Sequence, residues 1–241
     1  MPRGLPDFYN PDYGVAGSSR DLNPLILATL GFNSVDGFGR VLFVDDFQSS
    51  INHWNANHNG GASDPVLSND YADHGLTSLK CDSGAAAALD VSYVRRDFMI
   101  QECHRVGIEF SAYVSGMPQE IEVTFSKRFG QVAYDCMVYI DRDNTLIGIY
   151  TPSGGVTVFT DALLTNYYAW VQIKVVVDFD TGKYSHLIVG QEKYDLSQYD
   201  LYTWNTGADD NRFMIEMAAY SDGLFANPCY FGHVILTVDE P

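Results

Sequence analysis

The strongest constraint on the fold is a repeated two-residue alternation of apolar and polar side chains. It runs through residues 108–114, 121–125, 171–179, 213–219 and 234–238. A period of two places every second side chain on one face of a β-strand, and these runs are separated by Gly, Asn, Asp and Pro, which favour turns. The pattern therefore predicts an all-β fold, an antiparallel two-sheet β-sandwich of the jelly-roll type over residues 41–241.

The first 40 residues have a different character. Their four prolines, at positions 2, 6, 11 and 24, predict an extended arm, with one short helix at 25–30. The arm carries apolar side chains that should not remain in water: Phe8, Tyr9, Tyr13, Leu25, Leu27 and Leu30. They could pack against the arm's own domain or against a neighbouring subunit. We therefore expect two parts, an N-terminal arm (1–40) and a sandwich domain (41–241).

Composition excludes several classes of protein. The 14 Lys and Arg face 31 Asp and Glu, and the net charge of −17 argues against nucleic acid or an anionic membrane as a partner. The four cysteines, at 81, 103, 136 and 229, are too scattered for a disulfide scaffold or a CxxC metal site. The N-terminal residues contain no apolar signal-peptide core, so we expect no export by a standard signal.

Three segments carry a family resemblance. Residues 43–47 read Phe-Val-Asp-Asp-Phe and are followed by Trp54 and by Gly-Leu-Thr-Ser-Leu-Lys at 75–80. A hairpin segment at 170–184 and a closing segment at 230–237 complete the pattern. Over roughly residues 40–240 the chain resembles concanavalin A-like (laminin-G and carbohydrate-binding-module) jelly rolls, as found in bacteriophage virion structural proteins. Such motifs specify a fold and leave the ligand open.

The resemblance also bears on cofactors. Related jelly rolls often hold a structural Ca²⁺ near their ends, which implies Asp45 and Asp46 as candidate ligands. His233 stands where the closing strand of the family commonly has Asp, and this weakens the expectation of calcium. The spacing of His53, His58 and His74 matches no zinc signature, and no other cofactor is expected.

A catalytic site would need paired carboxylates. Laminarinase-like relatives carry Glu-x-Asp-x-x-Glu on a strand, where the carboxylates serve as nucleophile and acid/base. Here Glu120 and Glu122 begin such a pattern, but Thr124 and Phe125 stand where the closing Glu belongs. We therefore interpret Glu120 and Glu122 as a solvated strand face, and we expect no enzyme.

Aromatic side chains are abundant in the second half of the chain. Four of them, in a stretch that also contains Asp, Ser and Gln, are candidates for a glycan site or a protein interface: Tyr194, Tyr199, Tyr202 and Trp204. Packing within the sandwich is the plainer explanation for many of the aromatic residues.

Together these features favour a non-enzymatic structural protein. We expect a bacteriophage virion component (a capsid-decoration, head-fibre or tail protein), made in the host cytoplasm and located in the virion. Its partners would be copies of itself, joined through the arm, and other virion proteins. The alternative is a carbohydrate-binding, lectin-like module, and a glycoside hydrolase is the third hypothesis.

The arm hypothesis gives a first prediction. Deleting residues 1–35 should leave a folded domain that no longer assembles, because each buried arm side chain contributes about 1.5–3 kcal/mol only on a surface that is already formed. Size-exclusion chromatography with light scattering measures assembly, and far-UV circular dichroism measures folding. An unfolded truncated chain would show that the arm belongs to its own core.

Overall fold

The computed structural model describes residues 39–73, 75–85, 87–98, 103–114, 120–141, 146–160, 170–223 and 228–241. The predicted arm, residues 1–40, falls almost wholly outside this part, so its short helix and its apolar side chains stay predictions. Among the described residues, no helix has the length and hydropathy needed to cross a membrane.

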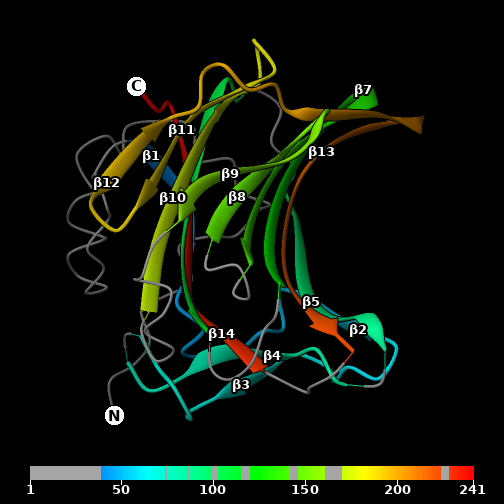
Figure 1. The fold of residues 1–241 in the computed structure, drawn as a ribbon, viewed down its shortest axis with the longest axis vertical. Coiled ribbons are helices and arrows are strands. Elements are labelled where there is room, and N and C mark those ends of the chain that lie inside the picture. Colours follow the sequence, from blue (N-terminus) through cyan, green and yellow to red (C-terminus); the bar gives the residue numbers. More distant parts are fainter. Residues whose placement is uncertain are drawn as a thin grey trace.

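The described strands form two antiparallel sheets, as the alternation predicts (Figure 1). The eight-stranded sheet has the following order, with β1 (Arg40–Asp45) also paired to β14: β12 (Glu192–Asp195), β11 (Lys183–Val189), β10 (Trp170–Asp178), β6 (Arg105–Val114), β14 (Pro228–Val238), β4 (Ser78–Asp82) and β3 (Val66–Ser68). The six-stranded sheet has this order: β2 (Asn55–Asn59), β5 (Ala88–Phe98), β13 (Tyr202–Asp222), β7 (Glu120–Asp141), β8 (Leu146–Thr151) and β9 (Gly154–Thr160). The predicted β-sandwich is confirmed.

Apolar side chains from both sheets fill the space between them. Phe125 of β7 stacks on Phe213 of β13, and Phe179, from the turn between β10 and β11, packs on both with ring centroids 5.5 Å away. Each predicted alternating run supplies its apolar residues to this layer, because every second side chain of a strand faces the opposite sheet. The layer therefore decides which side chains of each strand point outward.

Two short strands, β2 and β3, lie between residues 48 and 74, a segment that the alternating pattern of the sequence does not cover. β2 reads Asn-Ala-Asn-His-Asn and is exposed along its whole length, and β3 has three residues. β2 has no apolar face and no β-branched residue that would reveal a strand, and β3, although it begins with Val66 and Leu67, is too short to show an alternation. They form because β5 and β4 offer free edges for pairing.

The long strand β7 reverses direction near Gly130. The Ser126 hydroxyl donates a hydrogen bond to the Asp135 carboxylate, although nine residues of straight strand would separate them by about 30 Å. Gly130 has a φ of 61°, in the left-handed region that glycine adopts readily. β13 follows the reversal, since residues 210–220 pair with the first limb of β7 and residues 202–205 with the second.

One tyrosine connects the two sheets through the core. Tyr184 of β11 is 1% exposed, and its hydroxyl donates to the Tyr150 carbonyl on β8 (2.8 Å). The same hydroxyl accepts from the Met137 amide on β7 (3.0 Å). Burial raises the pKa of this phenol well above its ordinary value, so the hydroxyl keeps its proton as a donor.

Replacing this hydroxyl gives a second prediction. Tyr184→Phe should lower the free energy of unfolding by about 1–3 kcal/mol, because buried backbone groups lose their partner. Urea denaturation monitored by fluorescence measures the change. Tyr202→Phe, on an exposed side chain, is the control and should change stability little. Equal stability of Tyr184→Phe and the native chain would contradict a structural role for the hydroxyl.

Candidate functional site

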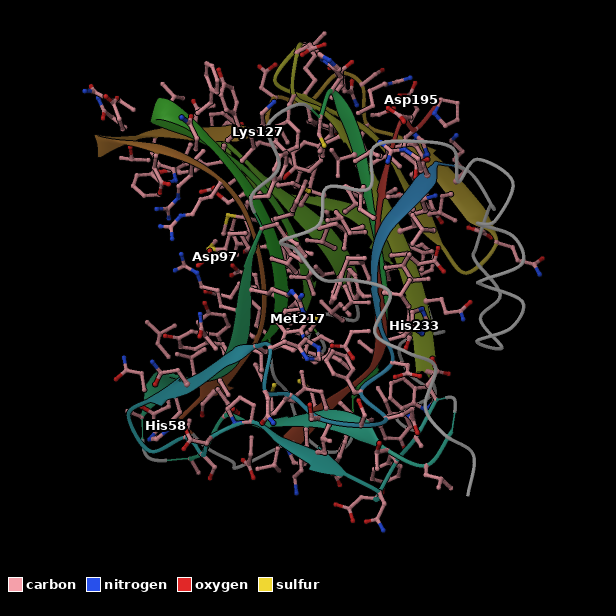
Figure 2. All side chains as sticks on the ribbon, turned by 180° about the vertical axis from the view of Figure 1, so that it is seen from behind. His58, Asp97, Lys127, Asp195, Met217 and His233 are labelled. Atoms are coloured by element: carbon pink, nitrogen blue, oxygen red, sulfur yellow. The ribbon has the colours of Figure 1, made fainter. Side chains whose placement is uncertain are left out.

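The outer face of the six-stranded sheet is concave. β13 reverses between residues 205 and 210 and is bowed from there to its C-terminal end, so that the reversal and that end swing away from the other sheet, as Figures 1 and 2 show from opposite sides. The outward side chains of β2, β5, β13, β7 and β8 line this surface, which we call the concave face. By contrast, the outer face of the eight-stranded sheet is largely buried, and there the Lys174–Glu240 ion pair (3.0 Å) is fully covered.

A pocket of about 770 Å³ lies at one end of the concave face, over β2 and β5. Its polar lining consists of Asn52, Asn55, Asn57, Tyr93, Arg95 and Asp97. Asn55 pairs with Arg95 and Asn57 with Tyr93 in the antiparallel ladder, so these side chains stand beside one another on the same face. The pocket therefore offers amide, phenol, guanidinium and carboxylate groups within one hollow.

A chain of ion pairs leads from the pocket along the face. Arg95 contacts Asp97 (3.2 Å), Asp97 contacts Arg212 of β13 (3.4 Å), and Arg212 contacts Asp210 (2.8 Å). All four side chains are at least partly exposed, so each pair contributes little to stability. The network instead holds the charged groups in position across two strands.

The series of ion pairs ends beside an aromatic residue, Trp204, at the point where β7 and β13 reverse direction. Arg128 pairs with Asp210 (3.2 Å), and its guanidinium lies 5.3 Å from the centre of the Trp204 ring. The Trp204 indole donates to Asp135 (2.6 Å), yet the side chain remains 39% exposed. The indole is thus held on two sides and keeps part of its surface open to solvent.

Three glutamates gather in the middle of the concave face. Glu120 accepts a hydrogen bond from the Tyr150 hydroxyl (3.1 Å), and Glu122 accepts one from Thr124 (2.7 Å). Glu216, on β13, lies directly opposite Thr124 in the ladder. Glu120 and Glu122, which the sequence predicts as a solvated strand face, are half-buried, and so is Glu216.

The surroundings of the three glutamates shift their pKa values in the same direction, upward. Burial raises the pKa of Glu120, Glu122 and Glu216, and mutual repulsion raises that of Glu122 further. Hydrogen bonds from Tyr150 and Thr124, and the charge of Arg95 near Glu216, oppose the rise in pKa. Burial also raises the pKa of the neighbouring Tyr220 phenol, with the glutamate charges adding to the effect.

The four predicted aromatic candidates separate into two pairs. Tyr202 and Trp204 are 42% and 39% exposed, and both lie on the segment of β13 that pairs with the second limb of β7. Tyr194 and Tyr199 instead pack partly buried against the core, with the Tyr194 ring 5.7 Å from that of Phe159. Only the first pair therefore stands near the concave face.

The calcium candidates lie elsewhere. Asp45 is 8% exposed, and its carboxylate accepts from the Trp54 indole (2.7 Å) and the Phe47 amide (2.9 Å) and contacts His53. Asp46 accepts from the Gln48 amide (3.1 Å). These contacts tie the Asp-Asp-Phe motif to Trp54. Among the residues that the structure describes, no three His, Cys, Asp or Glu side chains are grouped to hold a metal ion.

Sequence reasoning missed most of the concave face. Arg95, Tyr93 and Glu216 belong to no motif, and their strands are far apart in the chain. The one available signal was the alternating run at 213–219, which marks Glu216 as outward-facing without saying what it faces, whereas Arg95 and Tyr93 lie in no such run.

Comparison with known proteins shows similarity of fold only. No family model matches the chain, and no curated protein matches it. Among solved structures it is similar to the conserved carbohydrate esterase from the Shiga toxin-encoding bacteriophage phi24B (TM-score 0.55, 10% identity, covering 84% of this chain and 100% of that one). It is also similar to the laminarinase catalytic domain from Thermotoga maritima MSB8 (TM-score 0.52, 10% identity, 85% and 100%).

A third similar structure is a sialidase, with a TM-score of 0.55 and 10% identity. The match covers 86% of this chain and 19% of the sialidase chain. These neighbours are jelly-roll domains of concanavalin A-like type, which supports the predicted family resemblance at the level of the fold.

The half-buried glutamates give a third prediction. A glutamate whose pKa is raised in the folded state stabilises the fold fully below its ordinary pKa of 4.5, and this contribution is lost as the pH rises through the raised pKa. Glu122→Gln and Glu216→Gln should therefore raise the melting temperature above that of the native chain at pH 7. The gain should vanish below about pH 4.

Melting curves recorded between these pH values measure the effect. Glu192→Gln is the matched control, because Glu192 is an exposed residue of β12, and it should show no such trend. An increase in melting temperature that does not change with pH would contradict the raised pKa values of Glu122 and Glu216.

Proposed function

We propose that the protein binds carbohydrate on the concave face without cleaving it. The observation that carries the proposal is the combination of a partly exposed, rigidly held indole, Trp204, with a pocket of planar polar groups around Arg95 and Asn57. Aromatic faces pack on the apolar face of a pyranose ring, and amide, guanidinium and carboxylate groups hydrogen-bond its hydroxyls. The three similar structures, an esterase of carbohydrate, a laminarinase and a sialidase by name, support the same ligand class.

The glutamate cluster supports binding without hydrolysis. A retaining or inverting glycosidase needs one carboxyl group that stays protonated and one that stays ionised. Here the pKa values of Glu120, Glu122 and Glu216 all shift upward, with burial as the first cause in each. The direction of these shifts favours the neutral form of each carboxyl group, whereas the nucleophile or base of a glycosidase must be ionised.

The virion role stays a prediction. It rests on the arm hypothesis for residues 1–40, and the likeness to a bacteriophage esterase concerns the fold alone. Carbohydrate binding is compatible with such a role, since a surface protein of a virion can contact host glycans. Assembly with copies of itself remains tied to the deletion of residues 1–35 proposed above.

Carbohydrate binding is the fourth prediction. Soluble xylan, laminarin and β-1,4-galactan serve as neutral probes in affinity electrophoresis and calorimetry. At least one should bind, and Trp204→Ala and Arg95→Ala should each weaken it about tenfold, equivalent to about 1.4 kcal/mol. The bound polysaccharide should release no new reducing ends on long incubation.

The control is His104→Ala. His104 is exposed and pairs with Asp180 beside the turn from β10 to β11, away from the pocket residues, so binding should be unchanged. Failure of all three probes to bind, or native affinity in both concave-face variants, would overturn the proposed site. Release of reducing ends would overturn the non-catalytic part alone.

A further inference from the structure

Two of the four cysteines face each other across a pair of strands. Cys81 of β4 is the direct partner of Cys229 of β14 in the antiparallel register. Both are free thiols with 0% exposure, and they are hydrogen-bonded to each other. Opposite Cα atoms in such a ladder are about 4.5–5.5 Å apart, within the range of about 4.4–6.8 Å that disulfides span.

The other two cysteines have different neighbours. Cys136 of β7 is fully buried and hydrogen-bonds with Tyr184. Cys103 lies beside Lys127 and precedes β6. The face-to-face arrangement of Cys81 and Cys229 is therefore a specific property of these two positions and does not follow from burial alone.

We propose that Cys81 and Cys229 form a cross-strand disulfide when the chain folds under oxidising conditions. With glutathione disulfide as the oxidant, one protein thiolate attacks a glutathione sulfur and releases one glutathione. The second protein thiolate then attacks the mixed disulfide and releases another. The two cysteines lose two protons and two electrons in total, and one glutathione disulfide is reduced to two glutathione molecules.

The same geometry makes the redox state persistent after folding. Exchange requires a thiolate that the oxidant can reach, and both sulfurs are inaccessible in the folded chain. Burial, together with the neighbouring Cys81 thiol, raises the pKa of Cys229 well above its ordinary value, which makes the thiolate scarcer still. The bond therefore forms during folding or local opening, and the folded protein keeps the state in which it folded.

The disulfide would act at a weakly supported part of the sheet. β4 lies between β14 and the three-residue edge strand β3, and its pairing with β14 covers four residue pairs. A bond from β4 to the final strand closes most of the described chain into one loop. Such a loop stabilises the fold mainly by restricting the unfolded chain.

The test compares two ways of oxidising the full chain. In the first, the chain is unfolded in guanidinium with a reductant and then refolded in a glutathione redox buffer. In the second, the folded, reduced chain is exposed to the same buffer. The refolded chain should lose about 2 Da and two of its four titratable thiols. The folded chain should keep all four over the same period.

Peptide mapping of the native sequence identifies the linkage, so the test does not depend on a variant that folds. The joined peptides should contain Cys81 and Cys229, and the oxidised chain should melt about 5–15 °C above the reduced one. Cys103→Ser is the matched control and should oxidise like the native chain, whereas Cys81→Ser and Cys229→Ala should not.

Four thiols after refolding, or a linkage through Cys103 or Cys136, would overturn the proposal. A lower melting temperature of the oxidised chain would contradict the preformed geometry. Equally fast oxidation of the folded chain would contradict the persistence of the redox state. None of these outcomes bears on carbohydrate binding, which uses the opposite sheet.

Discussion

The apolar layer between the two sheets is the interaction on which the other features depend. Phe125, Phe179 and Phe213 meet there from different parts of the chain, and the Tyr184 hydroxyl connects β11 to β7 and β8. Because side chains alternate along a strand, burying one set in this layer turns the intervening set outward. The polar residues of the concave face are that second set, so core packing and the candidate site share one cause.

The curvature of the six-stranded sheet turns this outward set into a site. The reversal of β7 at Gly130 and the paired reversal of β13 place Trp204 at one end of the concave face. At the other end, β2 contributes the asparagines that line the pocket. Between them lie half-buried glutamates with raised pKa values. A concave surface that combines an indole, amides and carboxyl groups fits a polar ligand with apolar ring faces, which is the basis of the carbohydrate proposal.

The two proposals concern opposite sheets, and one predicts the affinity for a ligand whereas the other predicts how the chain folds and melts. Carbohydrate binding rests on side chains that are at least partly exposed, so it predicts changes in affinity when they are removed. The disulfide rests on thiols that are fully buried, so it predicts effects on folding history and melting temperature. Because both sulfurs are inaccessible once the chain is folded, formation of the bond depends on the conditions in which the chain folds and not on those in which it later works.

Local signals are enough to predict the fold class, because the two-residue alternation and the Gly, Asn, Asp and Pro residues between the runs are visible in short stretches of sequence. The sequence also marked Trp204 and Tyr202 as candidates, since abundant aromatic residues beside polar ones are visible in one stretch, and the structure leaves both partly exposed on β13. It could not reveal β2, which forms on the edge that β5 presents. Nor could it reveal that Asp97 pairs with Arg212, or that Arg95 lies opposite Glu216, because these residues come from different strands. It also interpreted Glu120 and Glu122 as solvated, because burial on an outward face depends on the curvature of the sheet. The pairing of Cys81 with Cys229 depends on the register between two strands that are distant in the chain, and that register is set when the sheet assembles.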